Sequence, residues 1–436
     1  MRRMHLLFGG LLLAVLPAAL SAQAVPDGSG ALDVSSFSRR TPSLESDPFR
    51  FALSPHWGFV ISANAVGANN ALNLTDAGSL ILLSRQDSAG QNQLRVADVI
   101  DALGLVPRGA GIRGDAQGTG GFFLGGPLGH NVHLSLSLAG RGYGSFFVDD
   151  NAVALLRDGN AARQAFSLGD TRGTVLATLE AGAHAVVDLG PLGSRDGVHL
   201  LMGFGGRYIR PAFYGQGRSL ISNGGLVVVS GDSIYANISV QASRTPVSSF
   251  SDLFSSSRGS GFAGDFLLRA EWPTNGLALE AMVANIGQVT VNGVENRTLN
   301  FQVATTQLDT VKSRLDSAKF VIQDTTNVTV TLPRIVRFAA SAWANHILQL
   351  DVAATMPVGG DYATPLRVDL GSTWRFVRPF PLRAGLVLGG SQGIGFTAGF
   401  SLETRVLYLD AEGESLGGLF RQAKGAGGRF SLGFFF

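Results

Sequence analysis

The sequence predicts an all-β protein, a transmembrane antiparallel β-barrel of about 14 to 16 strands with short turns at one end and long loops at the other. From about residue 117 onward, apolar and polar residues alternate with a period of two, as in strands with one apolar face. Hydrophobic residues make up 45% of the chain and charged residues only 15%, against a usual quarter charged. After the first 24 residues, no apolar run reaches the ~18 residues of a membrane-spanning helix. A chain of this kind is expected to cross a bilayer with strands, which then require a closed barrel.

Residues 1–24 have the pattern of a secretory signal peptide. Arg2 and Arg3 precede an apolar run over residues 6–16, and Ala22-Gln23-Ala24 forms a small-x-small cleavage site. The apolar run is short for a spanning helix, so cleavage is favoured over the alternative, an uncleaved anchor. We therefore expect a mature chain that begins directly after this segment and works outside the cytoplasm.

The charge and cysteine content exclude several classes of partner. Loss of the two arginines of the signal peptide lowers the 34 Lys and Arg residues to 32, which equals the number of Asp and Glu residues. A neutral mature chain gives no indication of nucleic-acid binding. The chain has no cysteine, so neither a disulfide framework nor a thiolate metal site can form.

Three further segments are expected after the signal peptide. Residues 25–50 are rich in Ser, Pro, Gly and Asp, which is typical of a flexible leader. Residues 51–115 combine a strand-like stretch with a short amphipathic helix over 94–105, and we interpret them as a plug-like or capping segment, similar to a hatch. Residues 116–436 contain the recurring strands and are predicted to form the barrel.

Two faces of opposite character recur along these strands. In residues 174–188, the apolar face of Val175 and Leu179 lies opposite the polar face of Glu180 and His184. The same pattern is found at 130–141, 365–376, 381–390 and 393–403. The apolar bands are roughly ten residues long, the span of a tilted strand across lipid, whereas a soluble sandwich needs an interlocking apolar core. We expect the apolar face to contact lipid and the polar face to line the barrel interior.

Short and long connections alternate along the predicted barrel. Gly126–Gly129 and Gly190–Gly193 repeat the turn Gly-Pro-Leu-Gly, and 273–276, 345–346 and 378–381 are similarly short. The long connections are expected at 142–172, 211–223, 244–260, 288–332 and 412–427. Counted back from a periplasmic C-terminus, the short turns fall on the periplasmic side and the long loops face outward.

The C-terminal residues resemble the signal by which outer-membrane barrels are recognised for insertion. Phe430, Leu432, Phe434 and Phe436 alternate on one face of the last strand. We expect this face to contact lipid and the strand to engage the barrel-assembly machinery.

Nine polar side chains are candidates for lining the lumen. They are His133, Glu180, His184, Asp188, Arg207, Arg367, Asp369, Arg375 and Arg383. Residues four apart on one strand, such as Glu180 and His184, are about 13 Å apart, too far for direct proton transfer. We therefore favour the interpretation that they are a wet lining of the lumen. The alternative is that, together with the arginines, they form a charged constriction that narrows the pore.

Neither a metal centre nor an active site is predicted. His130 and His133 lie three residues apart, so on a strand their rings point to opposite faces, and a metal site needs at least three converging ligands. No spacing singles out a nucleophile with its base. We therefore expect no enzyme activity and no cofactor.

Five stretches of the sequence share their order with a known family. They are "ALNLTDAGSLILLSRQ", "LRVADVIDALGL", "LSLAGRGYGSFFVDDNAVALLRDGN", "GFAGDFLLRAEWPTNGLALEAMVANIG" and the closing part from "PLRAGLVLGG" to Phe436. In this order of segments the chain resembles the FadL-like outer-membrane barrels of diderm bacteria. The Asn-Pro-Ala motif that typically opens FadL hatches is absent from this sequence. The stretch that comes nearest to it is "SANAVGANNA".

The resemblance implies a barrel in the bacterial outer membrane, with membrane lipid and the assembly machinery as partners. It also implies passive passage of small hydrophobic molecules through the barrel. Related barrels serve secretion or conjugation, so a non-transporting structural or secretion-associated barrel that binds partner proteins is the alternative function.

Overall fold

The structure is a computed structural model of the chain. The residues it describes are 49, 52–53, 56–73, 106, 108–109, 111–129, 131–157, 165–167, 169–192, 197–219, 226–230, 233–247, 258–272, 276–305, 320–359, 366–377, 379–390, 393–404, 406–419 and 422–436. The predicted signal peptide and the predicted helix over 94–105 lie outside these residues, as does nearly all of the leader.

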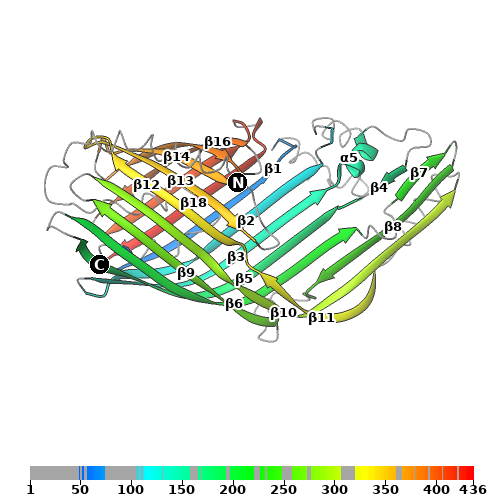
Figure 1. The fold of residues 1–436 in the computed structure, drawn as a ribbon, viewed down its shortest axis with the longest axis horizontal. Coiled ribbons are helices and arrows are strands. Elements are labelled where there is room, and N and C mark those ends of the chain that lie inside the picture. The colour runs from blue at the N-terminus through cyan, green and yellow to red at the C-terminus, as the bar shows by residue number, and fades with distance from the viewer. Residues whose placement is uncertain are drawn as a thin grey trace, which may run out of the picture.

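Fourteen strands form a closed antiparallel barrel, the lower end of the predicted count (Figure 1). In chain order they are β1 (Gly58–Asn69), β2 (Ile112–Pro127), β3 (Val132–Val148), β5 (Arg172–Leu192), β6 (Val198–Ser219), β9 (Gly259–Trp272), β10 (Leu277–Thr305), β12 (Arg334–Trp343), β13 (Leu348–Val358), β14 (Arg367–Trp374), β15 (Leu382–Gly389), β16 (Gly393–Glu403), β17 (Leu407–Leu416) and β18 (Gly425–Phe435). Closure occurs because β1 pairs with β2 on one side and with β18 on the other. The predicted fold class is therefore confirmed.

The barrel wall begins earlier in the chain than the expected boundary at residue 116. β1 lies within the segment 51–115, yet Gly58 pairs with both Gly125 of β2 and Phe435 of β18. Without β1, the edges of β2 and β18 would both be left unpaired, so this strand completes the wall.

A sheet extension, here called the wing, rises beyond the closed barrel on the side of β5, β6 and β10 (Figure 1). It consists of residues 288–305 of β10 with β8 (Ser233–Arg244), β11 (Val321–Thr331) and β7 (Leu226–Ser230). The short strand β4 (Ala165–Ser167) pairs with β7, and the helix α5 (Asp150–Arg157) follows β3. β5, β6 and β10 are 21, 22 and 29 residues long, well beyond the expected ten-residue bands. The far ends of β6 and β10 pair with β8 of the wing, and β5 pairs along the far end of β6.

The short turns that follow β2, β5, β9, β12, β14 and β16 lie at the end of the barrel that carries the C-terminus (Figure 1). Most longer connections lie at the other end, together with the short β15–β16 turn. Within the described residues, no helix is both long and apolar enough to cross a membrane.

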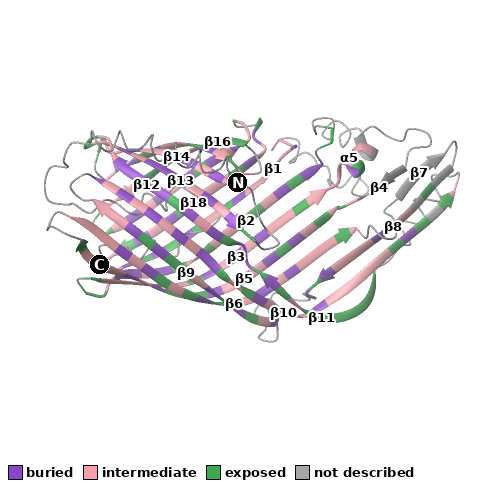
Figure 2. Ribbon diagram, in the orientation of Figure 1, coloured by how far each residue is buried: buried purple, intermediate pink, exposed green. Residues whose placement is uncertain are grey.

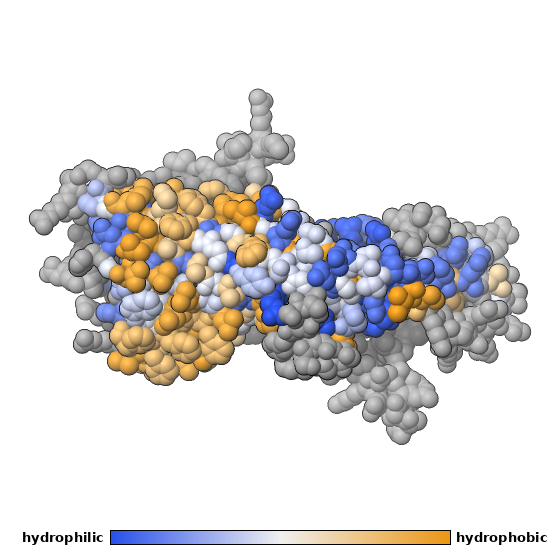
Figure 3. Space-filling view, turned by 90° about the horizontal axis from the view of Figure 1, so that it is seen from below, coloured by the Kyte–Doolittle hydropathy of each residue, from blue (hydrophilic) through white to orange (hydrophobic). Residues whose placement is uncertain are grey.

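The two faces of the wall differ in character. More buried and more exposed side chains alternate along most strands of the barrel wall (Figure 2). The exposed large hydrophobic residues of the wall include Phe59, Ile61, Phe122, Leu136, Leu138, Phe204, Phe262, Leu268, Phe338, Leu386, Phe396 and Phe400. In Figure 3, hydrophobic residues gather over the barrel end with the short turns, and hydrophilic residues predominate toward the wing. An apolar belt outside and charged residues inside are the arrangement of a barrel in a membrane.

Candidate functional site in the barrel interior

Arg207 on β6 lies at the centre of a buried ionic network, here called the Arg207 network. Its guanidinium donates to Glu180 Oε2 on β5 at 2.7 Å and to both carboxylate oxygens of Asp265 on β9, at 2.9 and 3.0 Å. Arg141 on β3 approaches Glu180 at 3.0 Å. All four side chains are buried. Because isolated buried charges are costly, this pairing is what allows them to occupy the interior.

His184 and Asp265 come together across an intervening strand. His184 Nε2 lies 2.8 Å from Asp265 Oδ2, although β6 separates β5 from β9 in the wall. Gly205 of β6 lies beneath this contact, and a Cβ there would approach the His184 ring at 2.3 Å. The glycine therefore provides the space in which the imidazole reaches the carboxylate.

Asn285 completes the network through an irregularity in β10. It is the only described non-glycine residue with a positive φ, 62°, and it lies in a bulge opposite Asp265, between the pairs formed by Val283 and Ile286. Its backbone N–H donates to Asp265 Oδ1 at 2.9 Å, and Arg207 donates to its side-chain oxygen. Asn tolerates the left-handed conformation better than most residues, and a bulge re-aims side chains next to functional sites.

The same asparagine bridges a break in the neighbouring strand. β11 and β12 follow one another along β10, interrupted only by Leu332 and Pro333. Asn285 Nδ2 donates to the carbonyl of Pro333 at 3.1 Å. The bulge and the break therefore lie side by side, where the closed barrel passes into the wing.

An apolar patch lies inside the wall next to this network. It is formed by Val186, Leu201, Leu267, Met282 and Ala284, together with Phe49, Ala52 and Leu53 from the segment before β1. Phe49 is fully buried, and its ring meets the His184 ring edge-on at 5.3 Å between centroids. Phe49 therefore covers both the apolar patch and one end of the Arg207 network.

A second ionic network, here called the Asp410 network, occupies the β14–β18 side of the interior. Asp410, Glu412 and Glu414 alternate along β17 and are all buried. Arg429 of β18 contacts Asp410 at 3.2 Å and Glu412 at 2.9 Å. Arg383 of β15 also pairs with Asp410.

Small interior side chains let the arginines of this network reach distant strands. Arg367 of β14 contacts Asp369 at 2.7 Å and Glu414 at 2.8 Å, although β15 and β16 lie between β14 and β17. The intervening strands carry small residues on this face, among them Gly385 and Gly399, whose added Cβ would clash with neighbours. Long charged side chains therefore lie over a floor of small residues.

The nine predicted lumen residues fall into three groups. Glu180, His184 and Arg207 are buried together in the Arg207 network, and Arg367, Asp369 and Arg383 are buried in the Asp410 network. His133, Asp188 and Arg375 are only half-buried. Asp188 lies 3.6 Å from His199, and Arg375 pairs with Glu403 at 3.1 Å, both near the short turns. The nine residues therefore do not meet in a single constriction.

Several members of the networks were not singled out from the sequence. The alternating pattern predicts that Asp410, Glu412 and Glu414 of β17 share a face, since "LDAEGES" places a carboxylate at every second position. Asp265 stands in a similarly alternating stretch. Nothing in the sequence marks Phe49 as an interior residue. Among the described residues, no group of three potential metal ligands converges.

The C-terminal residues lie along the wall as part of β18. The side chains of Phe430, Phe434 and Phe436 are 51%, 52% and 79% exposed, which places them among the apolar residues that the chain presents outward. Leu432 shares their parity and is half-buried.

No family model matches the chain, and no curated protein matches it. Among solved structures, it is similar to the P. putida toluene transporter TodX, with 9% identity over 89% of this chain and 91% of the other and a TM-score of 0.45. A Pseudomonas aeruginosa FadL homologue shares 12% identity over 95% and 97%, with a TM-score of 0.45. The CymD monoaromatic hydrocarbon channel shares 8% identity over 94% and 92%, with a TM-score of 0.40. A FadL homologue is thus among the similar structures, as the resemblance in the sequence predicts. The barrel itself is established by the strand pairing.

Proposed function

We propose that the protein is an outer-membrane barrel that allows passive passage of small hydrophobic molecules. The supporting observation is the interior apolar patch under Phe49, within a wall whose outer face carries an apolar belt. Apolar surface inside a barrel otherwise lined by ion pairs provides a site for an apolar molecule that the charged networks would not solvate.

The remaining parts of this assignment follow from the same proposal. Cleavage of residues 1–24 delivers the chain to the bacterial outer membrane, where residues 430–436 engage the assembly machinery. The nine polar residues line the passage, six of them as members of the two ionic networks. No catalytic step is assigned to them, because each buried carboxylate in these networks is neutralised by an arginine.

Uptake into vesicles tests this proposal. Purified protein is reconstituted into liposomes, and entry of toluene-sized aromatics, fatty acids and sugars is measured for the wild type, for Phe49→Ala and for a variant lacking 25–55. The deletion stops before β1. A longer deletion that removed the whole N-terminal part, residues 25–115, would also remove this strand of the wall. We expect faster entry of hydrophobic molecules when Phe49 no longer covers the patch.

The matched control is Phe59→Ala, which removes an aromatic ring from the outer face. It is expected to leave entry unchanged. If no form raises entry above that into protein-free vesicles, passive passage is rejected. That result would favour the second candidate, a structural or secretion-associated barrel that binds partner proteins, for which the wing would supply the binding surface.

A further inference from the structure

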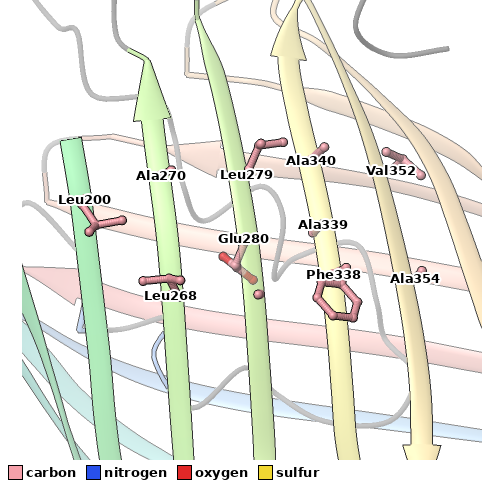
Figure 4. A pocket seen from close by; sticks show the side chains of 11 residues that line it. Leu200, Leu268, Ala270, Leu279, Glu280, Phe338, Ala339, Ala340, Val352 and Ala354 are labelled. Carbon is pink, nitrogen blue, oxygen red and sulfur yellow. The ribbon is translucent and has the colours of Figure 1, made fainter. Parts of the chain in front are cut away.

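A hollow of about 280 Å³ lies on the outer face of the wall, across β6, β9, β10, β12 and β13 (Figure 4). Leu268 and Phe338, which stand at its sides, are 39% and 48% exposed. Ala270, Ala281 and Ala340 are among the small residues between them. The hollow therefore opens outward from the barrel, away from the interior networks.

The register of the strands explains why the surface is hollowed here. The paired residues are Ala270 with Leu279, Leu279 with Ala340, Leu268 with Ala281, Ala281 with Phe338, and Phe338 with Ala354. In each row across the sheet, a large side chain therefore alternates with an alanine, and the two rows are staggered. The alanines form a zigzag floor that large residues flank.

The hollow lies in the half of the belt next to the short turns. Trp272 follows Ala270 by two residues on the same face of β9 and ends that strand. Tryptophan at a strand end is typical of the membrane–water interface. The one charged residue at the hollow, Glu280, is buried, and its carboxylate lies 3.3 Å from Arg269 and 3.5 Å from Arg337. Its charge is therefore matched on the interior side.

Within lipid, apolar surfaces gain little from the hydrophobic effect, so van der Waals contact decides what fills a depression. An acyl chain is flexible and can follow the alanine floor between Leu268 and Phe338. We propose that this hollow binds one acyl chain of a membrane phospholipid and retains it longer than the rest of the belt retains its lipid. The proposal rests on the membrane-embedded barrel of the proposed function.

Photolabelling tests this site on the full-length protein. The protein is reconstituted with a trace of phosphatidylethanolamine whose acyl chain carries a diazirine, and labelled positions are mapped by mass spectrometry. We expect roughly fivefold more label around Leu268, Ala281 and Phe338 than on the opposite part of the belt, around Leu386 and Phe396. A preference of this size corresponds to about ten additional dispersion contacts between the acyl chain and the wall.

Two substitutions separate specific binding from general contact with lipid. Ala281→Phe fills the hollow and is expected to remove most of the excess label. Ala398→Phe, at an exposed outer position of β16, should leave it intact. Even labelling around the belt, or unchanged labelling in folded Ala281→Phe, overturns the proposal. Vesicle uptake distinguishes the two proposals: concentrated label without uptake rejects only passage, and uptake with even labelling rejects only the lipid site.

Discussion

The two ionic networks of the interior use the same chemistry in different surroundings. The Arg207 network adjoins an apolar patch, a bulge at Asn285 and a break in the wall at Leu332 and Pro333. The Asp410 network lies on five strands, β14 to β18, whose described residues pair in continuous register. The contrast indicates that the Arg207 side of the barrel combines charged groups with irregular backbone and apolar surface. On the Asp410 side, ion pairs link regularly paired strands.

The largest expected effect comes from Arg207. Arg207→Met removes the cation shared by Glu180 and Asp265, and breaking a buried ion pair costs about 3–5 kcal/mol. We expect the free energy of unfolding in lipid vesicles, measured by urea titration, to fall by about that amount. Arg218→Met, which changes an exposed arginine, is the control. An equal effect in both variants would contradict the central role of Arg207.

A smaller loss is expected on the regular side. Arg429→Met removes contacts with Asp410 and Glu412, but Arg383 still pairs with Asp410. Loss of hydrogen bonds to charged groups costs about 1.5–3 kcal/mol. Vesicle uptake should stay near the wild-type rate, because this network does not contact the apolar patch. A larger loss of stability than in Arg207→Met would reverse the comparison.

The smallest effect isolates the crossing contact of His184 over β6. Gly205→Ala places a Cβ 2.3 Å from the His184 ring and 2.7 Å from the carbonyl oxygen of Ala183. Overpacking of this kind costs about 1–3 kcal/mol. Gly217→Ala, on the same strand but with open space around its Cβ, should change the free energy of unfolding little. If the two variants unfold alike, Gly205 is not needed for the crossing.

The sequence could predict which face a residue occupies but not which residues meet. Alternation alone places Glu180, His184, Arg367 and Asp369 on the polar face, and all four are buried in the structure. The meeting of Glu180 with Arg207 and Asp265 depends on the register of three strands, which alternation does not determine.

The alternating pattern of the sequence also does not predict the local irregularities of the strands. The bulge at Asn285 changes which residues of β10 face inward, since Met282 and Ala284 are buried before it and Val289 and Val291 after it. The reach of Arg367 to Glu414 depends on small residues in two other strands. Such contacts arise only once the sheet has closed.

The seam between β1 and β18 has a consequence for how the protein acquires its shape. Gly58 pairs with Phe435 and Ala68 with Gly425, so the seam joins strands from nearly opposite ends of the chain. Loop-closure entropy makes such a distant pairing slow to form. The seam is therefore expected to be the last contact made during biogenesis. Until it forms, the unfinished sheet has two free edges that a chaperone must protect against pairing with other chains.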